Sequence, residues 1–214
     1  RKGHADYTHK KQTGGHGQYA RVVLDVEPLP RGSGLVFGEK VVGGSVPKEF
    51  IPAVEKGVHE TAVHGVFAWY QLTDCQVTLL DGKHNPVDSS EMAFKLAASQ
   101  ALKEAINGSG GTLLEPVMNI RVFAPEANAG DVVSDLNTKR AKIHGINPEG
   151  GMSVVEAEVP LAEVQRYAAD LRSITQGRGA FELDFDHYGE VPQQLAQKVV
   201  EQSKKALEEA HAGH

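Results

Sequence analysis

The sequence predicts an α+β protein with two domains. Strand-like and helix-like segments alternate along the 214 residues, and one stretch alone, Asn107-Gly108-Ser109-Gly110-Gly111, has the composition of a linker. The order and spacing of the predicted strands and helices also change after this stretch. With 40% hydrophobic and 23% charged residues, the chain can bury either one or two ordinary cores. The linker therefore decides the prediction in favour of two domains.

The first domain begins with strand-like residues. The region from Thr8 to Glu27 is rich in β-favouring residues, and prolines follow it directly. A glycine-rich turn then leads into a second predicted strand, Leu35 to Val42. We predict a helix over Lys48 to His64, with Pro52 in its first turn, where a missing backbone N–H costs nothing. A further strand is predicted over Gln71 to Leu80.

The clearest helix is predicted over Asp88 to Asn107. Small and apolar residues recur at helical spacing and define one closely packing face: Phe94, Ala97, Ala98, Ala101 and Ala105. Asp88 is the predicted N-cap, and Glu91 follows it at capping-box spacing.

The second domain is predicted to follow the order βαββαβ. Its expected elements are strand 113–123, helix 130–142, strands 143–147 and 153–159, helix 161–175 and strand 180–186. This order is typical of the ferredoxin-like split arrangement, in which two helices cover one face of an antiparallel sheet. A last helix is predicted over Gln193 to Ala210.

Two polar loops carry the main functional signal. The first, residues 12–19, has three glycines in four positions, and the second, residues 81–91, leads into the long helix. Glycine allows a backbone to approach an RNA backbone closely, and flat polar side chains can meet phosphates and splayed bases. The alternative is a pair of ordinary β-turns. The candidate RNA-binding residues are Gly14, Gly15, His16, Gly17, Gln18, Lys83, His84, Asn85 and Pro86.

Charge supports selective rather than general contact with RNA. The net charge of −6 argues against nonspecific binding to phosphate. Basic residues nevertheless dominate the first 24 residues, whereas the other end of the chain is acidic. A basic region on an otherwise acidic protein suits binding to RNA at selected points. A charged surface that faces solvent and has no partner would have the same composition.

Catalytic and metal-binding patterns are weak. The segment nearest to a phosphate-binding loop, Gly38 to Ser45, has Gly44 where the lysine is needed, so we expect only a strand-to-helix turn. Ser89 and Ser90 lack a nucleophile elbow, and the histidines show no zinc-site spacing. A single cysteine excludes an internal disulfide and suits the cytoplasm. No apolar run approaches the about 18 residues of a membrane span. We therefore expect no catalytic residue, cofactor, metal or membrane contact.

Seven collinear segments resemble the C-terminal part of translation elongation factor G. They are Gly-Gly-His-Gly-Gln-Tyr (14–19), Val-Gly-Gly-Ser-Val-Pro-Lys-Glu-Phe-Ile-Pro-Ala-Val (42–54), Val-Asp-Ser-Ser-Glu-Met-Ala-Phe-Lys (87–95), Leu-Leu-Glu-Pro-Val-Met (113–118), Gly-Asp-Val-Val-Ser-Asp-Leu-Asn (130–137), Asp-Leu-Arg-Ser-Ile-Thr-Gln-Gly-Arg-Gly (170–179) and Phe-Asp-His-Tyr-Gly-Glu-Val-Pro (185–192). Such a run of ordered matches covers the chain from end to end.

The resemblance implies a fold for each part. Residues 1–112 would form a domain IV-like, mixed-sheet βαβ unit with an unusual left-handed crossover, completed by the C-terminal helix 189–214. Residues 113–188 would form the ferredoxin-like domain V. The hand of the crossover comes from the family alone, since handedness rules favour the opposite.

The resemblance also implies a function. The family is a multidomain GTPase that drives translocation of transfer RNA and messenger RNA, so this part would contact the ribosomal RNA of both subunits and ribosomal proteins. It would act as a cytoplasmic monomer, and GTP and magnesium would belong to the full-length protein. In the second domain, the expected phosphate contacts are Lys139, Arg140 and Lys142.

Both loops depart from the family pattern. The family's second loop carries Tyr-His-Glu/Asp before Val-Asp-Ser-Ser, whereas this chain has His84-Asn85-Pro86. In the first loop, His16 stands where translocases have arginine, and Ala20 stands where they have glycine. These departures resemble a paralogous copy of the factor, so the alternative is a non-translocating protein in ribosome protection, recycling or regulation. An alternative of another class is a stand-alone protein-interaction module.

Overall fold

The computed structural model describes residues 1–12, 14–66 and 69–212. Contacts within the chain divide it into two compact units. Unit 1 comprises residues 1–111 and 194–214, and unit 2 comprises residues 112–193. Each unit has a sheet and a hydrophobic core of its own.

Unit 1 is built on a mixed four-stranded sheet. Its strands are β1 (Gly3–Lys11), β2 (Gln18–Pro28), β3 (Leu35–Glu39) and β4 (Cys75–Lys83), in the spatial order β1-β2-β4-β3. Strands β1 and β4 pair antiparallel with β2, whereas β3 pairs parallel with β4. The expected mixed sheet is therefore confirmed. The hand of the β3-to-β4 crossover stays a prediction.

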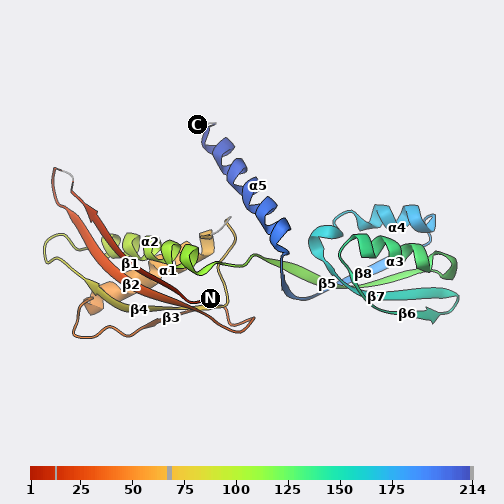
Figure 1. Cartoon of the computed structure of the whole chain (residues 1–214), viewed down its shortest axis with the longest axis horizontal. Helices are drawn as coiled ribbons and strands as arrows, with labels where there is room; N and C mark the ends of the chain where they lie inside the picture. The colour runs from red at the N-terminus through yellow and green to blue at the C-terminus, as the bar shows by residue number, and fades with distance from the viewer. Residues whose placement is uncertain (13, 67–68, 213–214) are drawn as a thin grey trace. The chain divides into compact units, whose positions relative to one another are not determined.

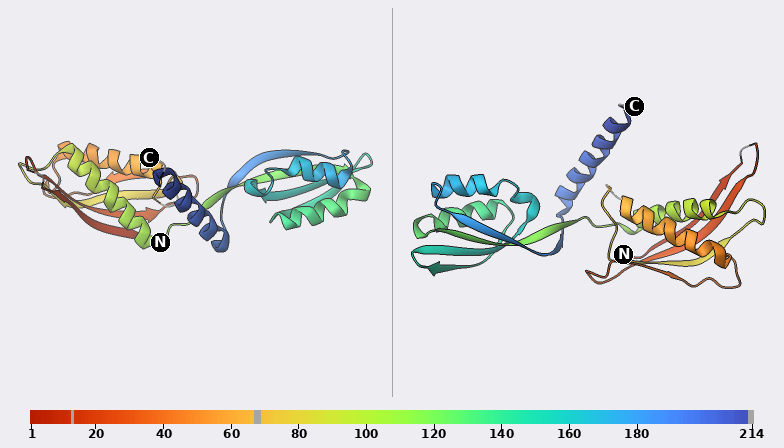
Figure 2. Two further views of the ribbon diagram at one scale, coloured as in Figure 1. Left: turned by 90° about the horizontal axis from the view of Figure 1, so that it is seen from above. Right: turned by 180° about the vertical axis from the view of Figure 1, so that it is seen from behind.

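Two helices, α1 (Ile51–His64) and α2 (Glu91–Ser109), cover one face of this sheet (Figures 1 and 2). The five residues predicted to form the packed face of α2 are fully buried, and Pro52 lies in the first turn of α1, as predicted. The helices approach each other closely at Gly57, where an added Cβ would lie 2.5 Å from the carbonyl oxygen of Lys95. A side chain at this position would therefore push the two helices apart.

The predicted N-cap of α2 is wrong. Ser90, not Asp88, has the extended backbone of an N-cap, with φ −149° and ψ 166°, and its hydroxyl accepts a 3.1 Å hydrogen bond from the amide of Ala93. Backbone groups of Asp88 and Ser89 are instead bonded to neighbouring loop segments. The helix therefore begins at Glu91, three residues later than predicted.

Several other boundaries also differ from prediction. Strand β1 begins at Gly3, five residues before the expected strand-like region, because polar residues on its exposed face hide the alternation. Strand β3 ends at Glu39 and leads into a turn in which Gly43 and Gly44 have positive φ, so the expected strand-to-helix turn is confirmed. A short 3₁₀ helix (Lys48–Phe50) precedes α1.

Unit 2 has the predicted ferredoxin-like order. Its elements are β5 (Leu114–Pro125), α3 (Ala129–Thr138), β6 (Lys142–Glu149), β7 (Met152–Pro160), α4 (Tyr167–Thr175) and β8 (Ala180–Glu190), with 3₁₀ turns at Glu126–Asn128 and Leu161–Glu163. The strands lie in the order β6-β7-β5-β8, and all three pairings are antiparallel. Helices α3 and α4 lie on one face (Figure 1). The ferredoxin-like prediction is therefore confirmed.

The last helix, α5 (Gln193–Ala212), is amphipathic and begins at its predicted start. Of the helices that the structure describes, none is long and apolar enough to cross a membrane.

Burial controls the chemistry of Cys75. Its side chain lies in the core of unit 1, with 5% of its surface exposed, and desolvation raises its pKa to about 11. A raised pKa in the folded state lowers stability once the unfolded thiol begins to ionise, and the loss grows with pH until the folded thiol ionises as well. The stability of the fold is therefore unaffected by this group at low pH, and it falls as pH rises from the unfolded thiol's pKa towards about 11.

We therefore expect Cys75 to resist thiol reagents at pH 8 in the native protein and to react rapidly in denaturant. Timing the release of the chromophore from an aromatic disulfide reagent, with free cysteine as the control, measures both rates. Native and denatured rates within a factor of about two of each other would contradict the buried placement.

Candidate nucleic-acid interface

The two polar loops meet in the structure. One joins β1 to β2, and the other joins β4 to α2 (Figure 1). The amide of Tyr19 donates to the carbonyl oxygen of Asp88 at 2.9 Å, and the Ser89 hydroxyl donates to the carbonyl oxygen of Tyr19 at 2.7 Å. The structure therefore brings both groups of predicted loop residues to one end of unit 1.

The second loop is organised by Asn85 and Ser89. The Ser89 hydroxyl accepts a 2.8 Å hydrogen bond from the Asn85 amide, and the Ser89 amide donates to the carbonyl oxygen of Asn85 at 3.0 Å. The side-chain oxygen of Asn85 accepts bonds from the amides of Val87 at 2.9 Å and Asp88 at 3.2 Å. Asn85 is thus a structural residue of this turn, while Lys83, His84 and Pro86 are exposed.

The first loop combines open backbone with one close contact. Cβ atoms added to Gly14 or Gly15 would meet nothing within 4 Å, so their backbone is open to a partner. A Cβ at Gly17 would lie 3.1 Å from the Asp88 carboxylate, so glycine allows the two loops to approach. Together with Gln12, these residues line a recess of about 460 Å³.

The remaining two candidates of the first loop differ in availability. The side-chain oxygen of Gln18 lies 2.8 Å from Nε2 of His9, so part of its bonding capacity is used inside the hairpin. His16 is exposed. Thr13, which belongs to this loop, lies outside the described residues.

This end of unit 1 carries groups that can form hydrogen bonds with a polar partner. Open glycine backbone, two exposed histidines and a lysine can donate to phosphates and base edges. In the described part of the chain, no group of three or more His, Cys, Asp or Glu side chains is placed to hold a metal ion.

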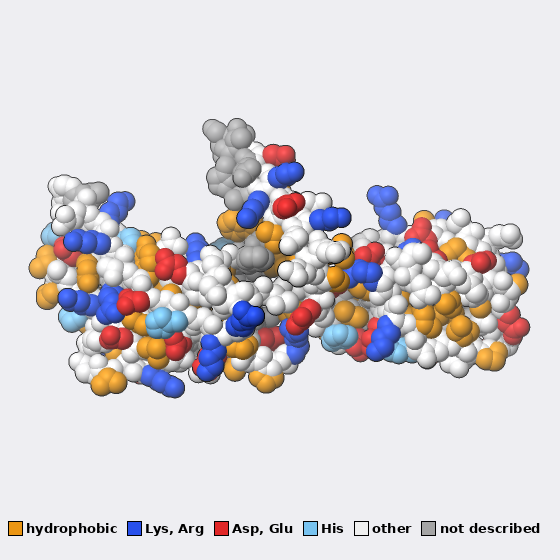
Figure 3. Space-filling view, in the orientation of Figure 1, with side chains coloured by type: hydrophobic (Ala, Val, Ile, Leu, Met, Phe, Trp, Pro, Cys, Tyr) orange, Lys and Arg blue, Asp and Glu red, His pale blue; other side chains and the backbone are white. Residues whose placement is uncertain are grey.

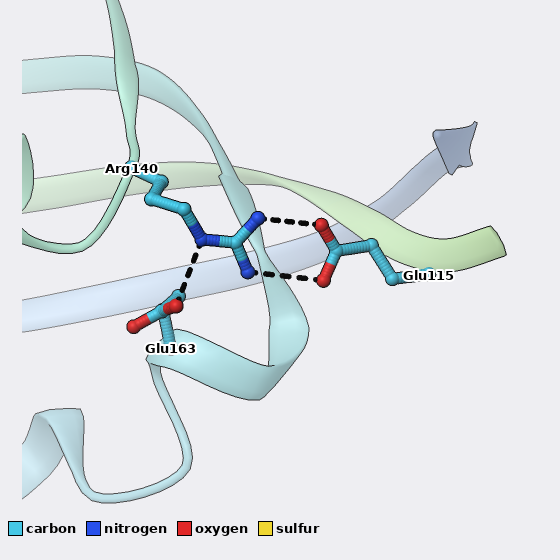
Figure 4. A network of polar contacts seen from close by, with 3 residues as sticks. All are labelled: Glu115, Arg140 and Glu163. Atoms are coloured by element: carbon cyan, nitrogen blue, oxygen red, sulfur yellow. Dashed lines mark hydrogen bonds and ion pairs between the residues drawn. The ribbon is translucent and has the colours of Figure 1, made fainter. Parts of the chain in front are cut away.

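Arg140, in unit 2, is held by two carboxylates (Figure 4). Its guanidinium donates to both oxygens of Glu115, at 2.6 and 3.0 Å, and its Nε donates to Glu163 at 2.8 Å. The hydrogen bonds to Glu115 raise the pKa of Arg140 despite partial burial. The predicted phosphate contact would compete with this bidentate ion pair.

Lys139 is also paired, whereas Lys142 is exposed. The Lys139 ammonium lies 2.9 Å from Asp135 and 3.1 Å from Asp170, with 14% of its side chain exposed. Burial lowers the pKa of Lys139, but hydrogen bonds to the two aspartates outweigh this effect and leave it raised. Lys142 opens β6 and is the member of the predicted trio best placed for a partner.

Sequence reasoning does not find the connecting residues. Tyr19 and Ser89 link the loops through backbone and hydroxyl groups, which no side-chain motif reveals. The distance in sequence between a glycine-rich hairpin and a helix start gives no signal of contact. The one available signal in the sequence is that both polar loops follow predicted strands, whose ends can lie at the same end of one sheet.

Comparisons with known proteins agree with this arrangement. The model of elongation factor G, domain IV, matches residues 1–110, and the model of the elongation factor G C-terminus matches residues 112–199. An elongation factor G-like protein of Thermotoga maritima is 46% identical over 206 residues, which cover 96% of this chain and 30% of that protein. Elongation factor G of Aquifex pyrophilus is 50% identical over 190 residues, covering 89% of this chain and 27% of that protein.

A crystal structure of a protein from Thermus thermophilus has the same fold. It superposes with a TM-score of 0.81 at 41% identity, over 96% of this chain and 31% of that one. The fold and the two family matches define the C-terminal domains of a translation factor. The chain belongs to the elongation factor G family and corresponds to its C-terminal part. It spans less than a third of the length of the Thermotoga and Aquifex relatives.

The Ser89→Ala substitution tests the connection between the loops. It leaves the Asn85 amide and the Tyr19 carbonyl without their shared partner, and we expect the free energy of unfolding to fall by about 1–2 kcal/mol. Hydrogen exchange should accelerate at the Asn85 amide. The matched control is Ser90→Ala, which removes the helix cap and should accelerate exchange at Ala93 instead. Equal exchange at Asn85 in wild type and Ser89→Ala would contradict the connection.

The Arg140→Met substitution tests the ion-pair network. Two partly buried carboxylates would lose their cation, so we expect about 2 kcal/mol lower stability of unit 2 in urea unfolding followed by circular dichroism. Arg121→Met is the control, because Arg121 lies on an exposed surface 3.3–3.5 Å from Glu156 and Glu182. That change should cost about 0–1 kcal/mol. If Arg121→Met lowers the free energy of unfolding as much as Arg140→Met does, the Arg140 network contributes no more to stability than an exposed ion pair.

Proposed function

We propose that this chain is the ribosome-contacting part of a translational GTPase that promotes translocation of transfer RNA and messenger RNA. Membership of the elongation factor G family supports the class of protein. The observation that carries the proposal is the hydrogen-bonded union of the two loops, which presents open glycine backbone and exposed polar side chains at one end of unit 1.

Each loop would supply a different contact. The exposed backbone of Gly14 and Gly15 suits phosphate oxygens, because glycine has no side chain of its own to keep a partner away. Exposed His16 and His84 can stack on or donate to bases, and Lys83 adds a charge for phosphate. Lys142 would contribute a phosphate contact from unit 2, towards the large subunit.

The chemistry of GTP would lie in another part of the complete protein. In this chain the segment most similar to a phosphate-binding loop forms a turn at Gly43 and Gly44 and lacks the required lysine. We therefore propose a mechanical role. Binding through the loops would favour some ribosome conformations over others, and the nucleotide bound to another part of the complete protein would control which conformations are favoured. A cytoplasmic monomer that uses GTP and magnesium in its upstream domains fits this role.

A non-translocating paralogue is the second candidate. The observation in its favour is Asn85, which stands at the tip histidine's position and whose side-chain oxygen is already bonded to two backbone amides. His84 would then be the only imidazole of that loop available to RNA. A translocation rate of the complete protein far below that of a standard elongation factor G, with normal ribosome-stimulated GTP hydrolysis, would favour this candidate.

The His84→Ala substitution in the complete protein tests the leading proposal. Loss of one transition-state contact of about 1.4 kcal/mol slows translocation about tenfold, while ribosome-stimulated GTP hydrolysis stays unchanged because it occurs elsewhere. Stopped-flow measurement of messenger movement gives the first rate, and phosphate release gives the second.

The matched control is His59→Ala, which removes an exposed imidazole from α1, on the helix-covered side of unit 1. It should leave both rates unchanged. Equal translocation rates for wild type and His84→Ala would show that His84 makes no contact that speeds translocation.

A further inference from the structure

Among the described residues of unit 1, helices α1 and α2 cover one face of the sheet and leave its other face open. Both helices pack on the side where the core lies (Figure 2). Residues paired directly across strands share a face, and so do residues two apart on one strand. Because Ala20 and Val22 point into the core, their neighbours Tyr19 and Arg21 lie on the open face.

Each strand next to β2 carries a lysine at the loop end of this open face, near Tyr19 and Arg21. Lys10 of β1 pairs with Tyr19 of β2, and Lys83 of β4 pairs with Arg21 of β2. Strand spacing of about 4.8 Å places Lys10 and Lys83 on either side of the β2 residues. Lys and Arg side chains lie around this end of unit 1 in Figure 3.

The other charges of the open face are already paired. Lys2 lies 2.5 Å from Glu27, and His4 lies 2.6 Å from Asp25, at the end of the strands away from the loops. Arg21 donates to both oxygens of Asp6, at 2.7 and 2.5 Å. By contrast, Lys10 and Lys83 are exposed and have no carboxylate partner among the described residues.

We propose that Lys10, Tyr19 and Lys83 form a binding site for an unpaired RNA strand, with a base stacked on the Tyr19 ring and phosphates bound by the two ammonium groups. The site continues the loop surface down the sheet, because the Tyr19 backbone is also the point where the loops are joined. It rests on the proposed contact with RNA.

Charge complementarity and the half-buried Tyr19 ring together favour an unpaired RNA strand as the partner. Two unpaired lysines would attract any polyanion, including an acidic peptide. A ring on an open sheet face, with a lysine on each neighbouring strand, adds a stacking platform, which suits nucleobases and gives no advantage to an acidic peptide. Arg21, two residues along β2 from the ring, is already held by two hydrogen bonds to Asp6.

Fluorescence anisotropy with a labelled single-stranded RNA of about 12 nucleotides, a length that spans one such binding surface, tests the site on the full 214-residue chain. Tyr19→Leu should weaken binding roughly tenfold, whereas Tyr19→Phe should retain it. The double variant Lys10→Gln/Lys83→Gln should lower the slope of log affinity against log salt by about 1.4, at about 0.7 for each phosphate that is no longer bound. The control, Lys56→Gln/Lys103→Gln, changes the same charge on the helix side.

Weaker binding by Tyr19→Leu and by the first lysine pair, but not by the control pair, supports the site. Equal weakening by both lysine pairs, or full affinity in Tyr19→Leu, overturns it, as does competition by polyglutamate as strong as that by RNA. If loop variants His16→Ala and His84→Ala weaken binding while the face variants do not, the proposed function stands and the additional site falls. If the wild-type chain does not bind the RNA at low salt, both the additional site and the proposed function are contradicted.

Discussion

The hydroxyl of Ser89 lies between two loops whose bonded residues are 70 positions apart in sequence. It accepts a hydrogen bond from Asn85 and donates one to Tyr19, so one side chain satisfies backbone groups of both loops. Each such bond contributes about 0.5–1.5 kcal/mol net. Their larger effect is to order the loops before a partner arrives, which lowers the entropy cost of binding.

The elements beneath the loops provide a rigid base. Helix α2 is capped by Ser90, the residue next to Ser89, and its alanine-rich face is fully buried against the sheet. Gly57 allows α1 to pack closely on α2. Strands β2 and β4, which carry the two loops, are paired along most of their length. Recognition loops on such a scaffold keep their relative position.

Local patterns predict most of the fold. Helical spacing in α2 and the βαββαβ order of unit 2 are properties of neighbouring residues, and both are confirmed. The N-cap is misplaced by sequence reasoning because Asp88 and Ser90 are equally good caps in isolation, and only the contact with Tyr19 distinguishes them. Composition alone does not show that contact.

The candidate sites are less predictable than the fold. Glycine and histidine in the loops identify one end of unit 1, but Asn85 is a turn-forming residue. The family resemblance suggests Arg140 as a phosphate contact, together with its basic neighbours Lys139 and Lys142. Its carboxylate partners lie 25 and 23 positions away, and only the folded sheet brings them together.

We propose that the two loops act together as a single RNA-facing surface. Hydrogen exchange of the complete protein, free and bound to the ribosome, tests this claim most directly. We expect amides of both loops, including Gly15 and Asn85, to become protected together on binding. Protection confined to one loop, with the other exchanging as in the free protein, would contradict the claim.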